Sequence, residues 1–179
     1  MASGVGEVTP DQMAALGSSK IHTWQTPKRL FLAVQDYVIK NYGGPFELDA
    51  AASNENHLAP RWYTEEQNAL DPRNPWRGRV WCNPPYGDQI PPFMLKAFES
   101  AQAGAVVAML IPARTDTRAF HEIGSKAAEI LFLKGRVTFM GAPGNAPFSS
   151  AVLIFAKTAA PCRLKFWDPF QKNLAFDFG

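Results

Sequence analysis

The feature that most constrains the fold is an uninterrupted apolar stretch at residues 105–111, which reads Ala-Val-Val-Ala-Met-Leu-Ile and stops at Pro112. Antiparallel sheets commonly meet water on one face, so their strands alternate apolar and polar residues. Strands of parallel sheets are buried on both faces and are apolar throughout. Residues 105–111 therefore predict a strand that is buried on both faces, as in a mainly parallel sheet.

Patterns on either side of this stretch supply the other elements. A helix is predicted from Thr26 as its N-cap and Pro27 as its first residue to a stop at Gly43 and Gly44. Further helices are predicted near residues 92–98 and 116–124, and strands at 45–49, 78–82, 129–133, 136–140 and 150–156. Strands that alternate with helices and then follow one another predict an α/β fold whose mainly parallel sheet has an antiparallel edge hairpin.

Length and composition fit one domain with a single core, because the chain has 179 residues and 46% hydrophobic content. We expect this domain to cover residues 21–179, after a flexible arm of small and polar residues at 1–20. No apolar stretch approaches the roughly 20 residues of a membrane span, and no signal peptide is apparent. Cys82 and Cys162 lack metal-ligand spacing. These features predict a metal-free protein with reduced thiols in the cytoplasm.

Charge is unevenly distributed along the chain. Residues 1–90 contain 8 basic and 10 acidic side chains, whereas residues 91–179 contain 10 basic and 6 acidic ones. The second half can therefore face phosphate groups, although ordinary solvated Lys and Arg side chains explain the same imbalance equally well.

The string Asn83-Pro84-Pro85-Tyr86 follows the strand predicted at 78–82, at the end of the strand where open α/β sheets bind ligands. An Asn amide oxygen and a proline carbonyl can accept the two protons of an exocyclic amine, which directs the nitrogen lone pair towards an electrophile. The prolines offer no competing N–H group, and Tyr86 offers a flat face for an extruded base. The string thus indicates methylation of an exocyclic amine, foremost adenine N6. A simple turn after a strand is the alternative.

Several ordered stretches resemble the phage-type DNA N-6-adenine methyltransferases, a Dam-like family. They are 26–27 (TP), 48–53 (LDAAAS), 81–86 (WCNPPY), 110–117 (LIPARTDT), 134–136 (KGR) and 147–150 (PFSS). The resemblance covers most of the chain and implies a Rossmann-like fold that uses S-adenosylmethionine to methylate adenine in DNA. A phage-type protein is expected in the cytoplasm of a bacterial host cell.

The resemblance also implies a set of donor-binding residues, namely Thr26, Pro27, Asp49, Ala50, Ala51 and Asn68. Asp49 matches an acid that holds the ammonium group of the donor, although it also suits a turn cap. Thr26 matches a position that lines the donor pocket. Asn68, with Asp71 as a nearby substitute, matches a polar residue that reaches the adenine amine of the donor. Wider methyltransferase families have a Gly-rich loop where this chain has alanines.

DNA contacts implied by the resemblance lie in the second half of the chain, at Arg114, Asp116, Lys134, Arg136 and Phe148. Arg114 is expected to bind a phosphate, and Asp116 to orient it through an ion pair or to cap the next helix. Arg136 and Lys134 are expected to follow the DNA backbone. Phe148 either stacks near the target base or belongs to the core.

The sequence thus predicts direct methyl transfer from S-adenosylmethionine to adenine N6 in double-stranded DNA, by a monomer or homodimer without a covalent intermediate. Two alternatives remain open. The first is methylation of another planar amine, in protein glutamine or in RNA guanine. The second is a non-catalytic module that binds DNA or S-adenosylmethionine.

Overall fold

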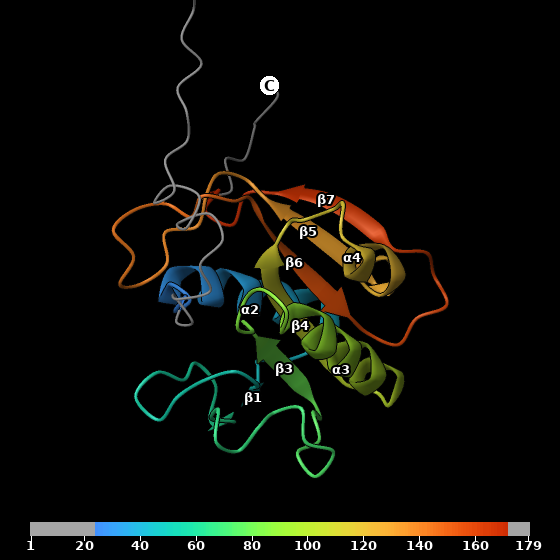
Figure 1. Cartoon of the computed structure of the whole chain (residues 1–179). Helices are drawn as coiled ribbons and strands as arrows, with labels where there is room; N and C mark the ends of the chain where they lie inside the picture. The colour runs from blue at the N-terminus through green and yellow to red at the C-terminus, as the bar shows by residue number, and fades with distance from the viewer. Residues whose placement is uncertain (1–23, 172–179) are drawn as a thin grey trace, which may run out of the picture.

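The computed structural model describes residues 24–171 (Figure 1). Its helices are α2 (Lys28–Tyr42), α3 (Ile90–Gln102), α4 (Arg118–Glu122) and the 3-10 helix η1 (Gly124–Lys126). Its strands are β1 (Leu48–Asp49), β2 (Arg61–Trp62), β3 (Arg79–Cys82), β4 (Val106–Pro112), β5 (Glu129–Leu133), β6 (Ser150–Phe155) and β7 (Arg163–Trp167). The predicted flexible arm at 1–20 lies outside the described residues.

All seven strands form one sheet in the order β2-β1-β3-β4-β6-β5-β7. Strand β6 is antiparallel to both of its neighbours, and the other pairs are parallel. The predicted mainly parallel α/β fold is confirmed. Six strands consequently end at the same edge of the sheet, and the chain turns to opposite sides of β1 when it forms β2 and then β3. Such a switch point is where open sheets bind ligands.

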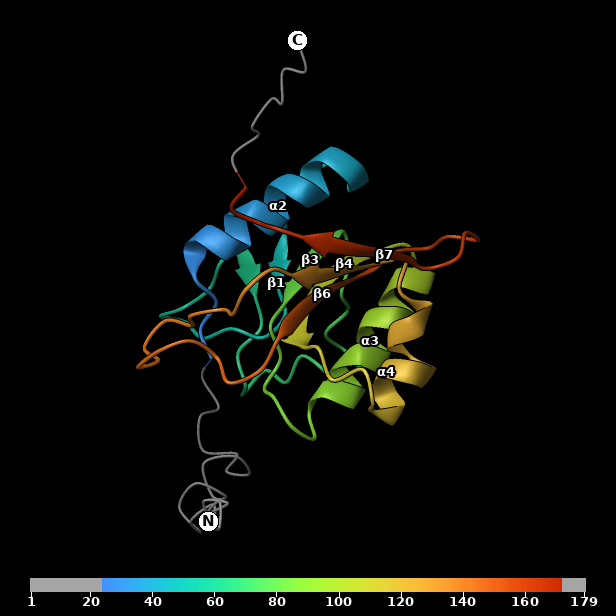
Figure 2. The same cartoon turned by 90° about the horizontal axis from the view of Figure 1, so that it is seen from above.

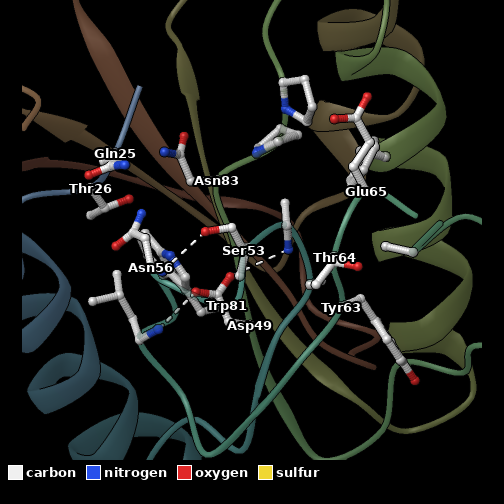
Figure 3. Close-up of a pocket in the computed structure, with 18 of the residues that line it drawn as sticks. Gln25, Thr26, Asp49, Ser53, Asn56, Tyr63, Thr64, Glu65, Trp81 and Asn83 are labelled. Carbon is white, nitrogen blue, oxygen red and sulfur yellow. Dashed lines mark hydrogen bonds between the residues drawn. The ribbon is translucent and has the colours of Figure 1, made fainter. Parts of the chain in front are cut away.

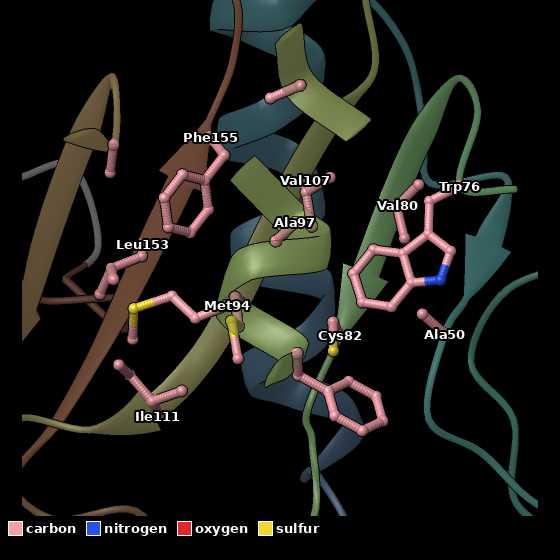
Figure 4. Packing of buried hydrophobic residues seen from close by; sticks show 14 of the residues in the cluster. Ala50, Trp76, Val80, Cys82, Met94, Ala97, Val107, Ile111, Leu153 and Phe155 are labelled. Carbon is pink, nitrogen blue, oxygen red and sulfur yellow. The ribbon is translucent and has the colours of Figure 1, made fainter. Parts of the chain in front are cut away.

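Helix α2 covers one face of the sheet, while α3 and α4 cover the other (Figure 2). The central strand β4 contributes to both layers. Val107, Met109 and Ile111 face the α3 layer (Figure 4), and Ala108 and Leu110 pack under α2. All five side chains are at most 1% exposed. The apolar stretch is therefore buried on both faces, as predicted.

The antiparallel pair β5 and β6 forms as predicted, but β7 pairs with the outer side of β5, so the pair lies one strand in from the edge. The strand predicted at 136–140 does not form, and only an isolated bridge joins Met140 to Gln25. Both edges of β5 are already occupied, which leaves no partner for another strand there. Strand β7 was not predicted, although Leu164 and Phe166 alternate with basic residues; both apolar side chains are exposed, so this alternation marks no buried face.

The start of α2 differs from the prediction. The helix begins at Lys28, and Pro27 is its N-cap, with no side-chain capping bond. Thr26 therefore precedes the helix by two residues, and the expected capping role is wrong. The predicted stop is confirmed, since Gly43 adopts a φ of 75° and its N–H bonds the Ile39 carbonyl at 3.2 Å. Across residues 24–171, no helix has the length and apolar character needed to cross a bilayer.

Candidate active site

A cavity of about 730 Å³ lies at the carboxyl ends of β1 and β3, the switch point of the sheet (Figure 3). Residues 49–53 line it from the end of β1, and residues 83–86 line it from the end of β3. Gln25 and Thr26, just before α2, and the segment 63–70 complete its wall. Its volume suits a small-molecule ligand. The fold thus brings two predicted parts of the site to one cavity: the acceptor segment, residues 83–86, and the loop expected to bind the methyl donor, residues 49–53.

The Asn83 amide has a defined orientation. Its Nδ2 donates a hydrogen bond of 2.5 Å to the Trp24 carbonyl, which can only accept. Its Oδ1 is buried and has no hydrogen-bond partner among the described residues. A buried acceptor without a partner costs free energy unless a ligand donates to it. The amide oxygen of Asn83 is therefore available to an incoming N–H group.

Two further acceptors follow Asn83. Pro84 is buried and Pro85 is half-buried, and both line the cavity. Within the described chain, neither proline carbonyl accepts a hydrogen bond. Neither residue has an N–H group that competes for a ligand acceptor. The two prolines thus present carbonyl acceptors and no backbone donor, which suits the recognition of an amino group.

Tyr86 belongs to an aromatic cluster formed by Trp24, Tyr86, Phe139 and Phe148. Its ring lies edge-on to Phe139 at 6.1 Å and to Phe148 at 5.6 Å between centroids. Trp24 contacts Phe139 at 5.1 Å and Phe148 at 5.8 Å. Burial raises the pKa of the Tyr86 phenol far above its usual value, so the hydroxyl stays neutral. Of the two interpretations of Phe148, the structure favours packing, because the residue supports Tyr86 and does not line the cavity.

Asp49 is 4% exposed and ends β1 beneath the cavity. Its Oδ2 accepts the Leu58 N–H at 3.1 Å, and its Oδ1 accepts the Ala51 N–H at 3.4 Å. Burial raises the pKa of Asp49 to about 6, although both backbone bonds and His57 oppose the shift. The carboxylate braces the loop after β1, as in the turn interpretation. It also lines the cavity, where a bound cation would stabilise its buried negative charge.

Of the other residues expected to bind the methyl donor, some line the cavity and others do not. Thr26 and Asn68 line the cavity, as do Ala50 and Ala51, but Pro27 does not. Asp71 does not line it either. The Arg73 guanidinium lies 2.6 Å from the Asp71 carboxylate and lowers the pKa of that carboxyl to about 2. Asp71 is therefore paired with Arg73 outside the cavity, and its expected role as a substitute for Asn68 stays a prediction that this geometry does not support.

Arg114 and Asp116 follow β4 at the same edge of the sheet, outside the cavity. Both are exposed, and no ion pair joins them or either of them to another described residue. The cap of α4 is Thr117, whose Oγ1 accepts the Phe120 N–H at 3.4 Å. Both structural roles expected of Asp116 are thus wrong, while Arg114 remains free to contact an anion.

Lys134 and Arg136 follow β5 and also lie outside the cavity. Lys134 pairs with Asp168 at 3.0 Å between Nζ and Oδ2. The Arg136 guanidinium donates to the Ala146 carbonyl at 3.2 Å, across the loop that leads to β6. Neither residue therefore belongs to the cavity, and Arg136 braces a loop.

Comparison with known proteins identifies the family. The family of DNA N-6-adenine-methyltransferases (Dam) matches residues 15–166. The chain belongs to the Dam family. It is 35% identical over 136 residues to a DNA N-6-adenine-methyltransferase of Escherichia phage T1, across 74% of this chain and 50% of the relative. It is 32% identical over 120 residues to one of Haemophilus phage HP1, across 65% of each.

The chain thus spans about half the length of the phage T1 relative and 65% of the phage HP1 relative. The Dam match includes the predicted site residues from Thr26 to Phe148. The resemblance stated from the sequence motifs is therefore confirmed for the family, and the structure adds where those motifs meet.

Sequence reasoning missed two features of this Dam cavity. The first is the Trp24 carbonyl, a backbone group that no sequence motif marks. The second is the charge of the wall, because four acidic residues line the cavity while no Lys, Arg or His among the described residues does so: Asp49, Glu55, Glu65 and Glu66. The acidic pair Glu65 and Glu66 in the loop after β2 is a sequence signal for the second feature, but only the fold places it on the wall of the same cavity as Asp49.

Proposed function

We propose that this Dam-family chain transfers a methyl group from S-adenosylmethionine to the N6 amine of adenine in double-stranded DNA. The observation that carries the proposal is the unpartnered Oδ1 of Asn83, oriented by the Trp24 carbonyl in the same cavity as Asp49. The two phage relatives are named for this reaction.

The cavity fits the proposed donor. S-adenosylmethionine supplies an electrophilic methyl group on a positively charged sulfur, and the acidic wall complements that charge. Asp49 would hold the ammonium group, and Ala50 and Ala51 leave room beside it because their side chains are single methyl groups. Thr26 and Asn68 place polar groups on the cavity wall for the remainder of the donor.

Binding of the target adenine follows from the two oxygens that have no hydrogen-bond partner among the described residues, Asn83 Oδ1 and the Pro84 carbonyl. Asn83 Oδ1 and the Pro84 carbonyl would accept the two N6 protons, orient the lone pair and stabilise the positive charge that develops on nitrogen. Tyr86 would stack on the extruded base. Because burial keeps the Tyr86 phenol neutral, it does not act as a base. The excess proton leaves to water once the nitrogen has been alkylated.

The test offers tritium-labelled S-adenosylmethionine with unmethylated double-stranded DNA, with RNA or with protein. We expect label in DNA as N6-methyladenine, and its loss in Asn83→Ala with donor binding retained. Asn41→Ala is the matched control, because Asn41 is an exposed asparagine on α2 outside the cavity. Label in RNA or protein alone would support the other acceptors. Donor binding without transfer to any of the three would indicate a non-catalytic module.

A further inference from the structure

Met140 is a large apolar side chain that is 51% exposed, one residue after Phe139 of the aromatic cluster. Its backbone N–H donates to the Gln25 carbonyl at 2.9 Å, and Gln25 lines the cavity. The preceding residue, Phe139, is 1% exposed and belongs to the aromatic cluster beside Tyr86. Met140 is therefore fixed through its backbone next to the acceptor segment, while its side chain meets solvent.

The surrounding loop suits contact with a polyanion. Residues 134–149, between β5 and β6, include two basic residues and no acidic residue; Lys134 pairs with Asp168, and Arg136 has no ion pair among the described residues. In Figure 1 this segment (orange) extends beyond the end of the sheet, on the side of the loops that follow β1 (teal). The Ala146 N–H donates to the Val137 carbonyl at 2.8 Å, and Arg136 donates to the Ala146 carbonyl. These bonds brace the base of the loop, so Met140 is presented on a preorganised support.

An adenine inside a duplex cannot reach the cavity until it leaves the base stack, which costs a few kcal/mol. Proteins that open a base stack commonly insert an apolar side chain between base steps, and methionine is among those used. The unbranched Met side chain adapts readily to an irregular gap. An exposed methionine beside the acceptor segment, on a loop free of acidic residues, therefore suits this task.

We propose that Met140 is the wedge that fills the space left in the duplex when adenine turns into the cavity. This inference rests on the proposed methylation of DNA. It predicts that the loss of Met140 slows methylation of double-stranded DNA and not of single-stranded DNA, because a wedge matters only where a base stack must be opened. Single-stranded DNA presents adenine without that cost.

The experiment measures methylation of the same unmethylated DNA in native and heat-denatured form by wild type, Met140→Ala and Met140→Leu. We expect Met140→Ala to lower the rate on native DNA roughly tenfold, a part of the unstacking cost, and to leave the denatured DNA rate within about twofold. Met140→Leu should retain most activity on both, since leucine also serves as a wedge. Ile39→Ala is the control, because Ile39 is 43% exposed near the far end of α2.

Equal losses on both forms, or no loss on native DNA, would overturn the wedge and leave the proposed function intact. A wild-type protein that methylates neither form would overturn the proposed function, and the wedge with it.

Discussion

The carboxyl edge of the sheet contains two regions of opposite charge. The cavity beyond β1 and β3 is lined by four acidic residues and, within the described chain, by no basic one. The loops after β4 and β5 carry Arg114, Lys134 and Arg136, all exposed, with Asp116 as their single acidic residue. Because mobile ions screen exposed charges beyond roughly 10 Å, each region acts mainly on the ligand it contacts. One edge can therefore serve a cationic donor and a polyanion.

The two regions also differ in how their polar groups are engaged. In the cavity, Asp49 accepts two backbone bonds and Asn83 is oriented by a carbonyl. On the basic side, Arg114 is exposed and unpaired among the described residues. We therefore expect large effects from single atoms in the cavity, and small, additive and salt-dependent effects in the basic loops.

The largest effect is expected at Asn83, where the acceptor segment meets the Trp24 carbonyl. Asn83→Asp replaces the amide NH2 with an oxygen, so a carboxylate oxygen faces the Trp24 carbonyl and the orienting bond is lost. We expect the methyl-transfer rate at saturating donor to fall roughly 100-fold, as when one preorganised hydrogen-bonding group is removed. Single-turnover methylation measures this rate, and calorimetry measures donor affinity, which the added carboxylate should not lower.

Asn41→Ala should match the wild type in both measurements. If Asn83→Asp methylated DNA at the wild-type rate, the Trp24 carbonyl would not control the amide orientation.

The next effect concerns Asp49 and the charge of the cavity. Asp49→Asn removes the carboxylate that would hold the donor ammonium group, so donor affinity should fall about 30-fold, which corresponds to roughly 2 kcal/mol. In the wild type, affinity should also fall as pH drops below about 6, where Asp49 takes up a proton. Calorimetry between pH 5 and pH 8 checks both expectations. A pH profile in Asp49→Asn identical to that of the wild type would contradict the assignment.

The same substitution should stabilise the protein without donor. The pKa of folded Asp49, about 6, lies above its ordinary value of 3.8. Its contribution to stability is therefore fully present below pH 3.8 and lost as pH rises through about 6. At pH 7, Asp49→Asn should raise the free energy of unfolding by about 1–2 kcal/mol, after allowance for one lost backbone hydrogen bond. Urea denaturation at pH 7 measures the gain, which should vanish near pH 4.

A smaller effect is expected in the basic loops. Arg114→Ala should raise KM for DNA several-fold, lower the salt dependence of DNA binding by about one unit of log–log slope, and leave donor affinity unchanged. Lys40→Ala, an exposed change in the last turn of α2, is the control. DNA binding measured over a range of salt concentrations gives this slope for both variants and the wild type. An unchanged slope would remove Arg114 from the DNA surface.

The smallest effect is expected at the rim of the cavity. Glu65 is exposed and lines the cavity (Figure 3). Glu65→Gln should weaken donor binding about twofold at low salt and less at high salt, because exposed charges contribute little and are screened. The KM for DNA should not rise. A rise in that KM would place DNA, rather than the donor alone, beside the acidic wall.

Several elements were predictable from sequence because their signals are local. Residues 105–111 are buried on both faces whatever their partners, so their composition alone indicates a central strand. Strands β2 and β7 were missed for the opposite reason. The first is two residues long, which is too short for a periodic signal. The second alternates basic and apolar residues over 163–166, but it is mostly exposed and lacks the apolar composition of a buried strand. The segment 136–140 carries such a signal, but β6 and β7 already occupy both edges of β5.

The sequence by itself determined the mainly parallel α/β fold, the family, and the acceptor segment and acid at strand ends, because residue type and short-range order suffice for each. Only the tertiary structure decided how these groups are set. It joined Asn83 to the carbonyl of Trp24, paired Asp71 with Arg73 outside the cavity, and brought four acidic side chains to the wall of one cavity. The backbone carbonyl is the same in every residue, so the sequence does not mark the one that binds Asn83. Charges separated along the chain interact only once the sheet has brought them together.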